Sequence, residues 1–116
     1  MFGQGIVTEA RSLLVEINTN VFRRRTVVGR AYYGAFHRVL KAAYEKGYIA
    51  SNDFVHSQLI RWLSKQPNVN LQRAGVQLGS MVQKRRVADY QPNSIVSAQD
   101  AKDAVVRAEN ILKLIP

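Results

Sequence analysis

Apolar residues recur along this chain at the three- and four-residue spacing of amphipathic helices, and no segment shows the sustained alternation of a half-buried strand. The pattern predicts five helical segments. The first two cover residues 5–21 and roughly 23–46. The third follows a cap at Ser51 or Asn52 and is stopped by Pro67, the fourth starts at Asn68 or Asn70 and ends before the loop 91–94, and the fifth is capped by Ser97. Because the connections are short, neighbouring helices should pack antiparallel. We therefore expect an all-α, up-and-down bundle that forms a single domain over residues 1–116.

Two of the expected helix ends carry clear sequence signals. Gly47 follows the second segment, where a glycine commonly caps a helix C-terminus. Ser97 precedes the last segment and Asp100 stands three residues further on, which is the spacing of a capping box. These signals indicate that the second helix ends near Gly47 and that the last helix begins after Ser97.

The segment 23–46 shows two faces when its residues are placed at steps of about 100°. The apolar face gathers Val28, Tyr32, Ala35, Phe36, Val39, Ala42 and Ala43. The opposite face gathers Arg23, Arg30, Tyr33, Gly34, His37 and Lys41. Arg30 and His37 are nearly two helical turns apart, so their side chains should point the same way. Gly34 lies between them, and close approach of a second helix or a ligand would offset the cost of a mid-helix glycine, roughly 1 kcal/mol.

The basic charge of the chain is concentrated in its first 90 residues. The net charge is +9 and the isoelectric point about 10.4. Residues 1–50 contain eight basic and three acidic side chains, residues 51–90 contain six and two, and residues 91–116 contain three of each. Such a field suits a polyanion, most readily nucleic acid. It also fits an acidic protein partner or a purely solubilising role.

Three consecutive arginines, residues 23–25, stand at the start of the second segment. Positive charge at a helix N-terminus opposes the helix dipole, and a bound phosphate would explain why it is tolerated. Alternatively, the first helix runs on into this segment and the arginines are solvated.

Several kinds of chemistry are absent from the sequence. There is no cysteine, no glycine-rich phosphate loop, no serine nucleophile elbow and no His-Glu-x-x-His pattern, and the eight carboxylates do not suggest a metal site. We expect neither a metal nor a cofactor. No apolar run approaches the ~20 residues of a membrane helix, and residues 1–5 do not resemble a signal peptide. A cytoplasmic protein without a membrane partner is the expectation.

Arg30 and His37 leave open a metal-free cleavage of RNA. RNA supplies its own nucleophile, the 2′-hydroxyl; a histidine can accept its proton, and an arginine can stabilise the charge that develops on the phosphate. One histidine per chain does not easily serve as both base and acid, so a homodimer would bring two copies together. The two side chains are also compatible with ordinary solvated positions. His56 lies at the edge of an apolar stripe, and we interpret it as structural.

Three stretches of the chain resemble small prokaryotic HEPN-domain proteins, over roughly residues 5–115. Residues 30–37 read Arg-Ala-Tyr-Tyr-Gly-Ala-Phe-His and resemble an Arg-Ala-Tyr-Tyr-Ala-x-Phe-His stretch in a central helix of that family. His56-Ser57 stands where the family has a Thr-His-Ser element, with Val55 replacing the threonine. Residues 85–90, Arg-Arg-Val-Ala-Asp-Tyr, resemble the family's Arg-x-x-Ala-Asp-Tyr element at the end of the fourth helix.

The resemblance implies a helical bundle that often dimerises. Many HEPN proteins are metal-independent endoribonucleases with an arginine and a histidine separated by four to six residues, a spacing that Arg30 and His37 satisfy. Many serve in toxin–antitoxin, CRISPR or antiphage systems, often beside a nucleotidyltransferase antitoxin, and others are non-catalytic modules. The ribonucleases usually have a polar residue directly after the arginine, where this chain has Ala31.

The main hypothesis is therefore a HEPN-type homodimer that binds or cleaves RNA, with Arg30 on the phosphate and His37 as base or acid. The side chains expected to bind nucleic acid are Arg23, Arg24, Tyr33, Lys41, Arg85 and Arg86. Arg85 continues the apolar stripe of its helix, so it should point inward or along a cleft; Asp89 would orient Arg30 or Arg85, with Tyr90 packed beside it. The alternatives are a non-catalytic module that binds a nucleotide or a partner such as a nucleotidyltransferase, and a plain dimerisation domain.

Overall fold

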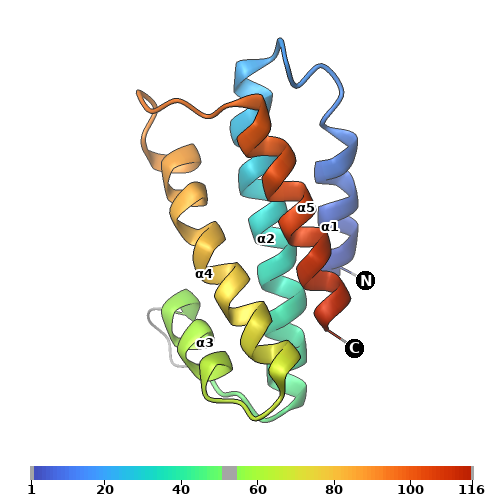
Figure 1. Ribbon diagram of the computed structural model, residues 1–116, viewed down its shortest axis with the longest axis vertical. Helices are drawn as coiled ribbons and strands as arrows, with labels where there is room; N and C mark the ends of the chain where they lie inside the picture. Colours follow the sequence, from blue (N-terminus) through green and yellow to red (C-terminus); the bar gives the residue numbers. More distant parts are fainter. Residues whose placement is uncertain (1, 51–54, 116) are drawn as a thin grey trace.

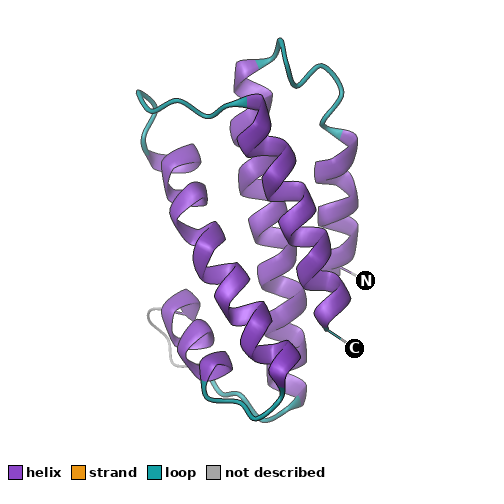
Figure 2. Ribbon diagram, viewed as in Figure 1, coloured by secondary structure: helices purple, strands orange, loops and turns teal. Residues whose placement is uncertain are grey.

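Helix α2 runs through the middle of the molecule and contacts every other helix (Figure 1). The structure, a computed structural model, describes residues 2–50 and 55–115. These residues form the helices α1 (Phe2–Ser12), α2 (Val21–Glu45), α3 (Val55–Ser64), α4 (Val69–Tyr90) and α5 (Ala98–Leu114). No strand occurs in this part of the chain (Figure 2). The expected all-α helical bundle is confirmed.

The first helix is shorter than the apolar pattern predicts. The pattern predicts a helix over residues 5–21, but α1 begins at Phe2 and ends at Ser12, and residues 13–19 form turns. Glu16 adopts a left-handed backbone conformation with φ 63°, which a continuous helix does not allow. Ile17 is nevertheless buried. Its place in the apolar pattern therefore reflects a core contact that is made from a turn and not from a helix. The alternative in which the first helix continues into the second is therefore wrong.

Three helix ends are capped, two of them by the residues whose sequence signals are described above and one by Asn68, a predicted start of the fourth segment. Gly47 has φ +97° just after α2, and Asn68 accepts a hydrogen bond from the backbone N–H of Leu71 at the start of α4. Ser97 and Asp100 form the full capping box of α5. The predicted caps of the third helix, Ser51 and Asn52, lie outside the described residues.

The apolar face of α2 is buried as the sequence predicts, but part of its polar face is buried too. All seven residues of its apolar face are buried, as expected. Gly34, which the helical pattern places on the polar face, is also buried, because α1 packs over part of that face. A Cβ on Gly34 would lie 2.7 Å from the carbonyl oxygen of Gly3 and 2.8 Å from Cγ2 of Val7. The glycine therefore allows the backbones of α1 and α2 to approach closely.

The arginines at the start of α2 connect separate loops. Arg23 donates to the carbonyl of Val15, and Arg24 donates to those of Ile17 and Asn18, so both hold the turn that follows α1. Arg25 reaches the end of α4 and donates to the carbonyls of Val87, Ala88, Gln91, Pro92 and Ser94. All three guanidinium groups thus satisfy main-chain oxygens, which accounts for a positive run at a helix N-terminus.

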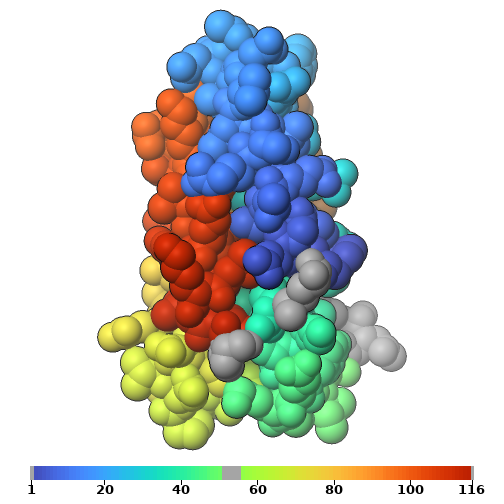
Figure 3. All heavy atoms as spheres, turned by 90° about the vertical axis from the view of Figure 1, so that its right-hand side faces the viewer, coloured from blue at the N-terminus to red at the C-terminus, as the bar shows by residue number. Residues whose placement is uncertain are grey.

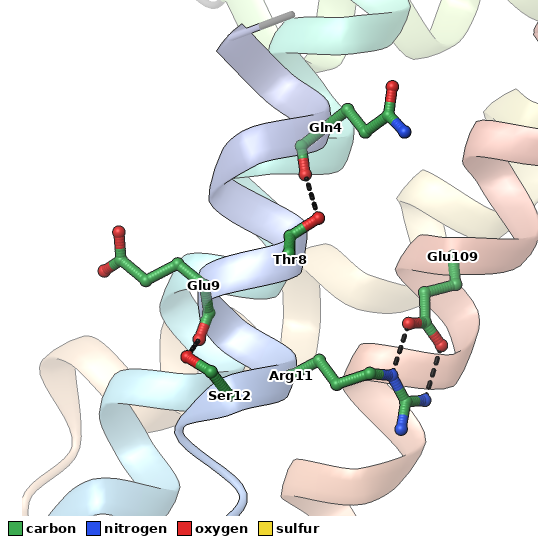
Figure 4. A network of polar contacts seen from close by, with 6 residues as sticks. All are labelled: Gln4, Thr8, Glu9, Arg11, Ser12 and Glu109. Atoms are coloured by element: carbon green, nitrogen blue, oxygen red, sulfur yellow. Dashed lines mark hydrogen bonds and ion pairs between the residues drawn. The ribbon is translucent and has the colours of Figure 1, made fainter.

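An ion pair joins the first and last helices on the side of the bundle where α1 and α5 meet. Seen from this side, α1 and the C-terminal part of α5 lie next to each other (Figure 3). Nε of Arg11 lies 2.5 Å from Oε2 of Glu109, and Nη2 lies 2.6 Å from Oε1 (Figure 4). These contacts lower the pKa of the Glu109 carboxyl. Within the described residues, no helix is long and apolar enough to cross a membrane.

Candidate functional site

A groove of about 780 Å³ lies along α2 and is bordered by the start of α3 and the C-terminal half of α4; we call it the α2–α4 groove. The side chains in its wall that carry chemistry are Arg30, Tyr32, Tyr33 and His37 from α2, His56 from α3, and Arg85 and Asp89 from α4. Each of the three stretches that carry the family resemblance therefore contributes to one groove. Residues far apart in the sequence meet here because α4 runs antiparallel to α2, so that the C-terminal part of α4 lies beside the N-terminal part of α2 (Figure 1).

Arg30 is positioned to reach a ligand in the α2–α4 groove. Its side chain is about half exposed, and its nearest carboxylate is Glu9 of α1, with 3.8 Å between Nε and Oε1. A pair that is this long and this exposed contributes little free energy. The guanidinium can therefore leave Glu9 for a phosphate at small cost.

His37 lies on the same wall, partly enclosed by aromatic rings. The ring centroid of His37 is 4.2 Å from that of Tyr33, 5.3 Å from that of Phe2 and 5.3 Å from that of Phe36. Burial by this apolar surround lowers the pKa of His37. A neutral imidazole and an imidazolium are both accessible to such a group near neutral and mildly acidic pH.

His56, which the apolar stripe of its helix favours as a structural residue, lines the α2–α4 groove. Its Nδ1 is hydrogen-bonded to the hydroxyl of Tyr32, and its ring lies 4.3 Å from that of Phe36. Burial first, and then the positive charges of Arg85 and Arg86, lower the pKa of His56. Burial also raises the pKa of Tyr32 to about 12, so the hydroxyl stays protonated.

Arg85 enters the groove from α4, as its place on the apolar stripe predicts. Nε of Arg85 lies 2.9 Å from Oδ2 of Asp89, and its guanidinium carbon lies 5.9 Å from the ring centroid of Tyr32. The same guanidinium carbon lies 5.2 Å from the ring centroid of Tyr90. Asp89 therefore orients Arg85 and not Arg30, and Tyr90 packs beside Arg85.

The other predicted contact residues are dispersed. Tyr33 is partly exposed on the groove wall, while Lys41 lines a neighbouring hollow of about 410 Å³ that shares His37 with the groove. Arg86 is exposed outside the groove but close enough to affect the pKa of His56. Arg23 and Arg24 are not brought to the groove, because their guanidinium groups bind the carbonyls of the turn after α1.

Two features of the groove are not evident from the sequence. The helical pattern assigns Tyr32 to the apolar face, and the residue is indeed buried, but its hydroxyl also forms a hydrogen bond with His56. The only sequence signal that points to a role for His56 is its place in the His56-Ser57 stretch, since helical periodicity cannot show that α3 lies beside Tyr32.

Among residues 2–50 and 55–115, no cluster of three or more histidine, aspartate or glutamate side chains is suited to hold a metal ion.

The arrangement offers two imidazoles, two guanidinium groups and several aromatic rings to one ligand. No protein-family model, curated protein or solved structure matches the chain. The functional conclusion therefore rests on the geometry of the α2–α4 groove and on the residues that build it.

Proposed function

We propose that this chain is a HEPN-type domain that binds RNA in the α2–α4 groove and cleaves it without a metal ion. The observation that carries the proposal is that Arg30, His37, His56 and Arg85 line a single groove. Cationic side chains bind phosphate oxygens, and imidazoles move protons at neutral and mildly acidic pH. The high positive charge of residues 1–90 would draw a polyanion towards this face.

The groove has the groups that a transesterification of RNA needs. Arg30, whose contact with Glu9 is long and exposed, would bind the phosphate and stabilise the charge that grows on it. His37 would exchange a proton with one of the reacting oxygens. Tyr33 and His37 present ring surfaces on which an unpaired base can stack. The reaction would leave a 2′,3′-cyclic phosphate and a free 5′-hydroxyl, and DNA would be resistant because it has no 2′-hydroxyl.

A homodimer is expected from the sequence because one histidine could not easily supply both proton transfers. With two histidines on the same groove, the chemistry no longer needs a partner's histidine. Dimerisation remains part of the proposal, as a means of binding a longer RNA, and static light scattering at micromolar protein concentration measures it. Growth arrest on expression, relieved by a neighbouring nucleotidyltransferase gene, would place the protein in a toxin–antitoxin or defence system.

The alternative is a module that binds a nucleotide or an acidic protein without cleaving anything. A volume of about 780 Å³ falls within the ~300–1,000 Å³ of typical small-molecule sites. In addition, Arg85 already has Asp89 as a partner, so part of its charge is neutralised before a ligand arrives. Tight binding of a mononucleotide, with no cleavage of RNA, would support this alternative.

The experiment is incubation of the purified protein with mixed cellular RNA in EDTA, followed by analysis of the ends produced. Wild-type protein and the control Arg73→Ala, an exposed position on α4 outside the groove, should cleave RNA and leave 2′,3′-cyclic phosphates. Arg30→Ala and His37→Ala should each reduce the rate on the order of 100-fold or more. RNA that stays intact with wild-type protein would refute the cleavage proposal.

A further inference from the structure

A second histidine with its own hydroxyl partner lies on the groove wall beside Phe36. The ring of Phe36 is 5.3 Å from that of His37 and 4.3 Å from that of His56, so it separates the two imidazoles. Both histidines also line the α2–α4 groove, where a ligand can contact them together. The hydrogen bond between the Tyr32 hydroxyl and His56 uses Nδ1, so Nε2 is the ring nitrogen that can meet a ligand.

We propose that His56 is the catalytic base of RNA cleavage, that Tyr32 positions it, and that a single chain therefore holds a complete acid–base pair. This inference rests on the proposed cleavage of RNA and assigns the two histidines different tasks. His56 accepts the proton from the 2′-hydroxyl, and His37 as an imidazolium donates one to the leaving oxygen.

The step balances without any other reactant. Nε2 of His56 takes the proton of the 2′-hydroxyl while the 2′-oxygen forms a bond to phosphorus. The bond between phosphorus and the 5′-oxygen breaks, and His37 protonates that oxygen. Arg30 stabilises the negative charge on the non-bridging oxygens. The products are a 2′,3′-cyclic phosphate and a 5′-hydroxyl, and the two histidines end with their protonation states exchanged.

The electrostatic surroundings distinguish the two imidazoles. His56 faces the positive groups of α4, namely Arg85 and Arg86, and these disfavour its protonated form. For His37 the cause that lowers the pKa is burial. His56 is therefore the better candidate for the neutral base, and His37 for the protonated acid.

The base role requires the tautomer of His56 in which Nδ1 carries the hydrogen, and the Tyr32 hydroxyl oxygen can accept a hydrogen bond from it. In this tautomer Nε2 keeps a lone pair for the proton of the ligand. Because burial raises the pKa of Tyr32 to about 12, the hydroxyl stays neutral through the working pH range and can keep its hydrogen bond to His56. Tyr32 is thus a positioning residue, and its stacked contact with Phe36 helps to keep its ring in place.

The test measures single-turnover cleavage of RNA in EDTA for His56→Ala, Tyr32→Phe and the control Arg73→Ala. His56→Ala should be slower on the order of 100-fold or more, and added imidazole should restore part of the rate. Tyr32→Phe should lose less, with a changed pH profile. If His56→Ala does not fold, as judged by circular dichroism, His56→Asn replaces it, because the amide can still bond to Tyr32. A variant at position 56 that cleaves at the wild-type rate overturns the inference while the proposed function stands.

Mixing two inactive variants tests whether one chain is sufficient. In an equimolar mixture of His37→Ala and His56→Ala chains, no chain has both histidines, so the rate should stay at the level of the separate variants. Recovery of a substantial fraction of the wild-type rate would show a site shared between chains and would overturn the single-chain pair. If wild-type protein cleaves no RNA, the proposed function itself fails, and the inference fails with it.

Discussion

Nε of Arg85 lies 2.9 Å from Oδ2 of Asp89, so this positive charge of α4 enters the groove with its counter-charge one helical turn away. Gly29 of α2 provides room for this carboxylate, since a Cβ there would lie 3.1 Å from Oδ1 of Asp89. The pair holds the guanidinium against the ring of Tyr32 and limits its attraction for free anions.

Removing that counter-charge should strengthen the binding of RNA. Asp89→Asn keeps the size of the side chain and leaves Arg85 with its full charge in the groove, so the dissociation constant for a short RNA should fall several-fold at low salt. Asp103→Asn on α5 makes the same change of charge at an exposed site outside the groove and serves as the control. Fluorescence anisotropy with a labelled oligonucleotide measures both variants; an equal effect of the two would mean that Asp89 has no specific role.

Arg25→Ala should destabilise the fold and not merely change its charge. The guanidinium donates to carbonyls of the last turn of α4 and of the loop that follows, and the substitution leaves these oxygens without that donor. The free energy of unfolding should fall by about 2–3 kcal/mol, measured by urea denaturation. Arg73→Ala, which removes an exposed arginine, should stay within about 0.5 kcal/mol of wild type. A similar small change for Arg25→Ala would show that these hydrogen bonds do not stabilise the fold.

Two glycine substitutions should have opposite effects on stability. In Gly34→Ala the new methyl group would lie under 3 Å from atoms of α1, so the helices must separate at a cost of about 1–3 kcal/mol. At Gly5 of α1 a Cβ would have no neighbouring atom within 4 Å, and Gly5→Ala should gain up to about 1 kcal/mol from helix propensity. Thermal unfolding followed by circular dichroism compares them. A neutral Gly34→Ala would contradict the close contact of α1 and α2.

The sequence is sufficient to predict the helical bundle but not how α1 covers α2. Periodicity identifies the buried residues of α2, and the Ser97 and Asp100 pair marks the start of α5, because both are local signals. The pattern is wrong for Gly34 and for the turn after Ser12, since the covering of one helix face by another depends on tertiary packing. Arg25 illustrates the same limit, because its partners lie more than 60 residues further along the chain.

The candidate site is predictable in part for the same reason. Arg30 and His37 share one helix, and helical spacing correctly places them on one wall of the groove. The pairing of His56 with Tyr32 needs the path of the chain between α2 and α3, which no local pattern specifies. The sequence leaves open whether Asp89 pairs with Arg30 or Arg85, and the structure decides for Arg85.

The rate of cleavage should be highest on the acidic side of pH 6.5. The reaction needs a neutral base, which requires a pH above the pKa of His56, and a protonated acid, which requires a pH below the pKa of His37. The pKa of both groups is lowered from the usual 6.5 by burial, and that of His56 also by Arg85 and Arg86. The charged and titratable groups of the groove that border the two rings are Arg30, Tyr32, Tyr33 and Tyr44 from α2 and Arg85 and Asp89 from α4; Arg86 lies outside the groove and also affects the pKa of His56.

As the pH rises above these pKa values, the protonated acid is lost and the rate should fall by about tenfold per pH unit. Single-turnover rates between pH values of about 4.5 and 8.5 measure the profile, with circular dichroism at each pH to confirm that the protein stays folded. A rate that rises steadily to the alkaline end of this range would contradict an imidazolium as the acid.

Metal-free cleavage through the 2′-hydroxyl can be measured with a DNA oligonucleotide that contains a single ribonucleotide, incubated with the protein in EDTA. We expect one cut, on the 3′ side of that ribonucleotide, with a 2′,3′-cyclic phosphate on one product and a 5′-hydroxyl on the other. The matching oligonucleotide with a 2′-O-methyl group at the same position should stay intact. Cleavage of the 2′-O-methyl oligonucleotide, or no cleavage of the one that keeps its 2′-hydroxyl, would show that the protein does not cleave RNA through the 2′-hydroxyl.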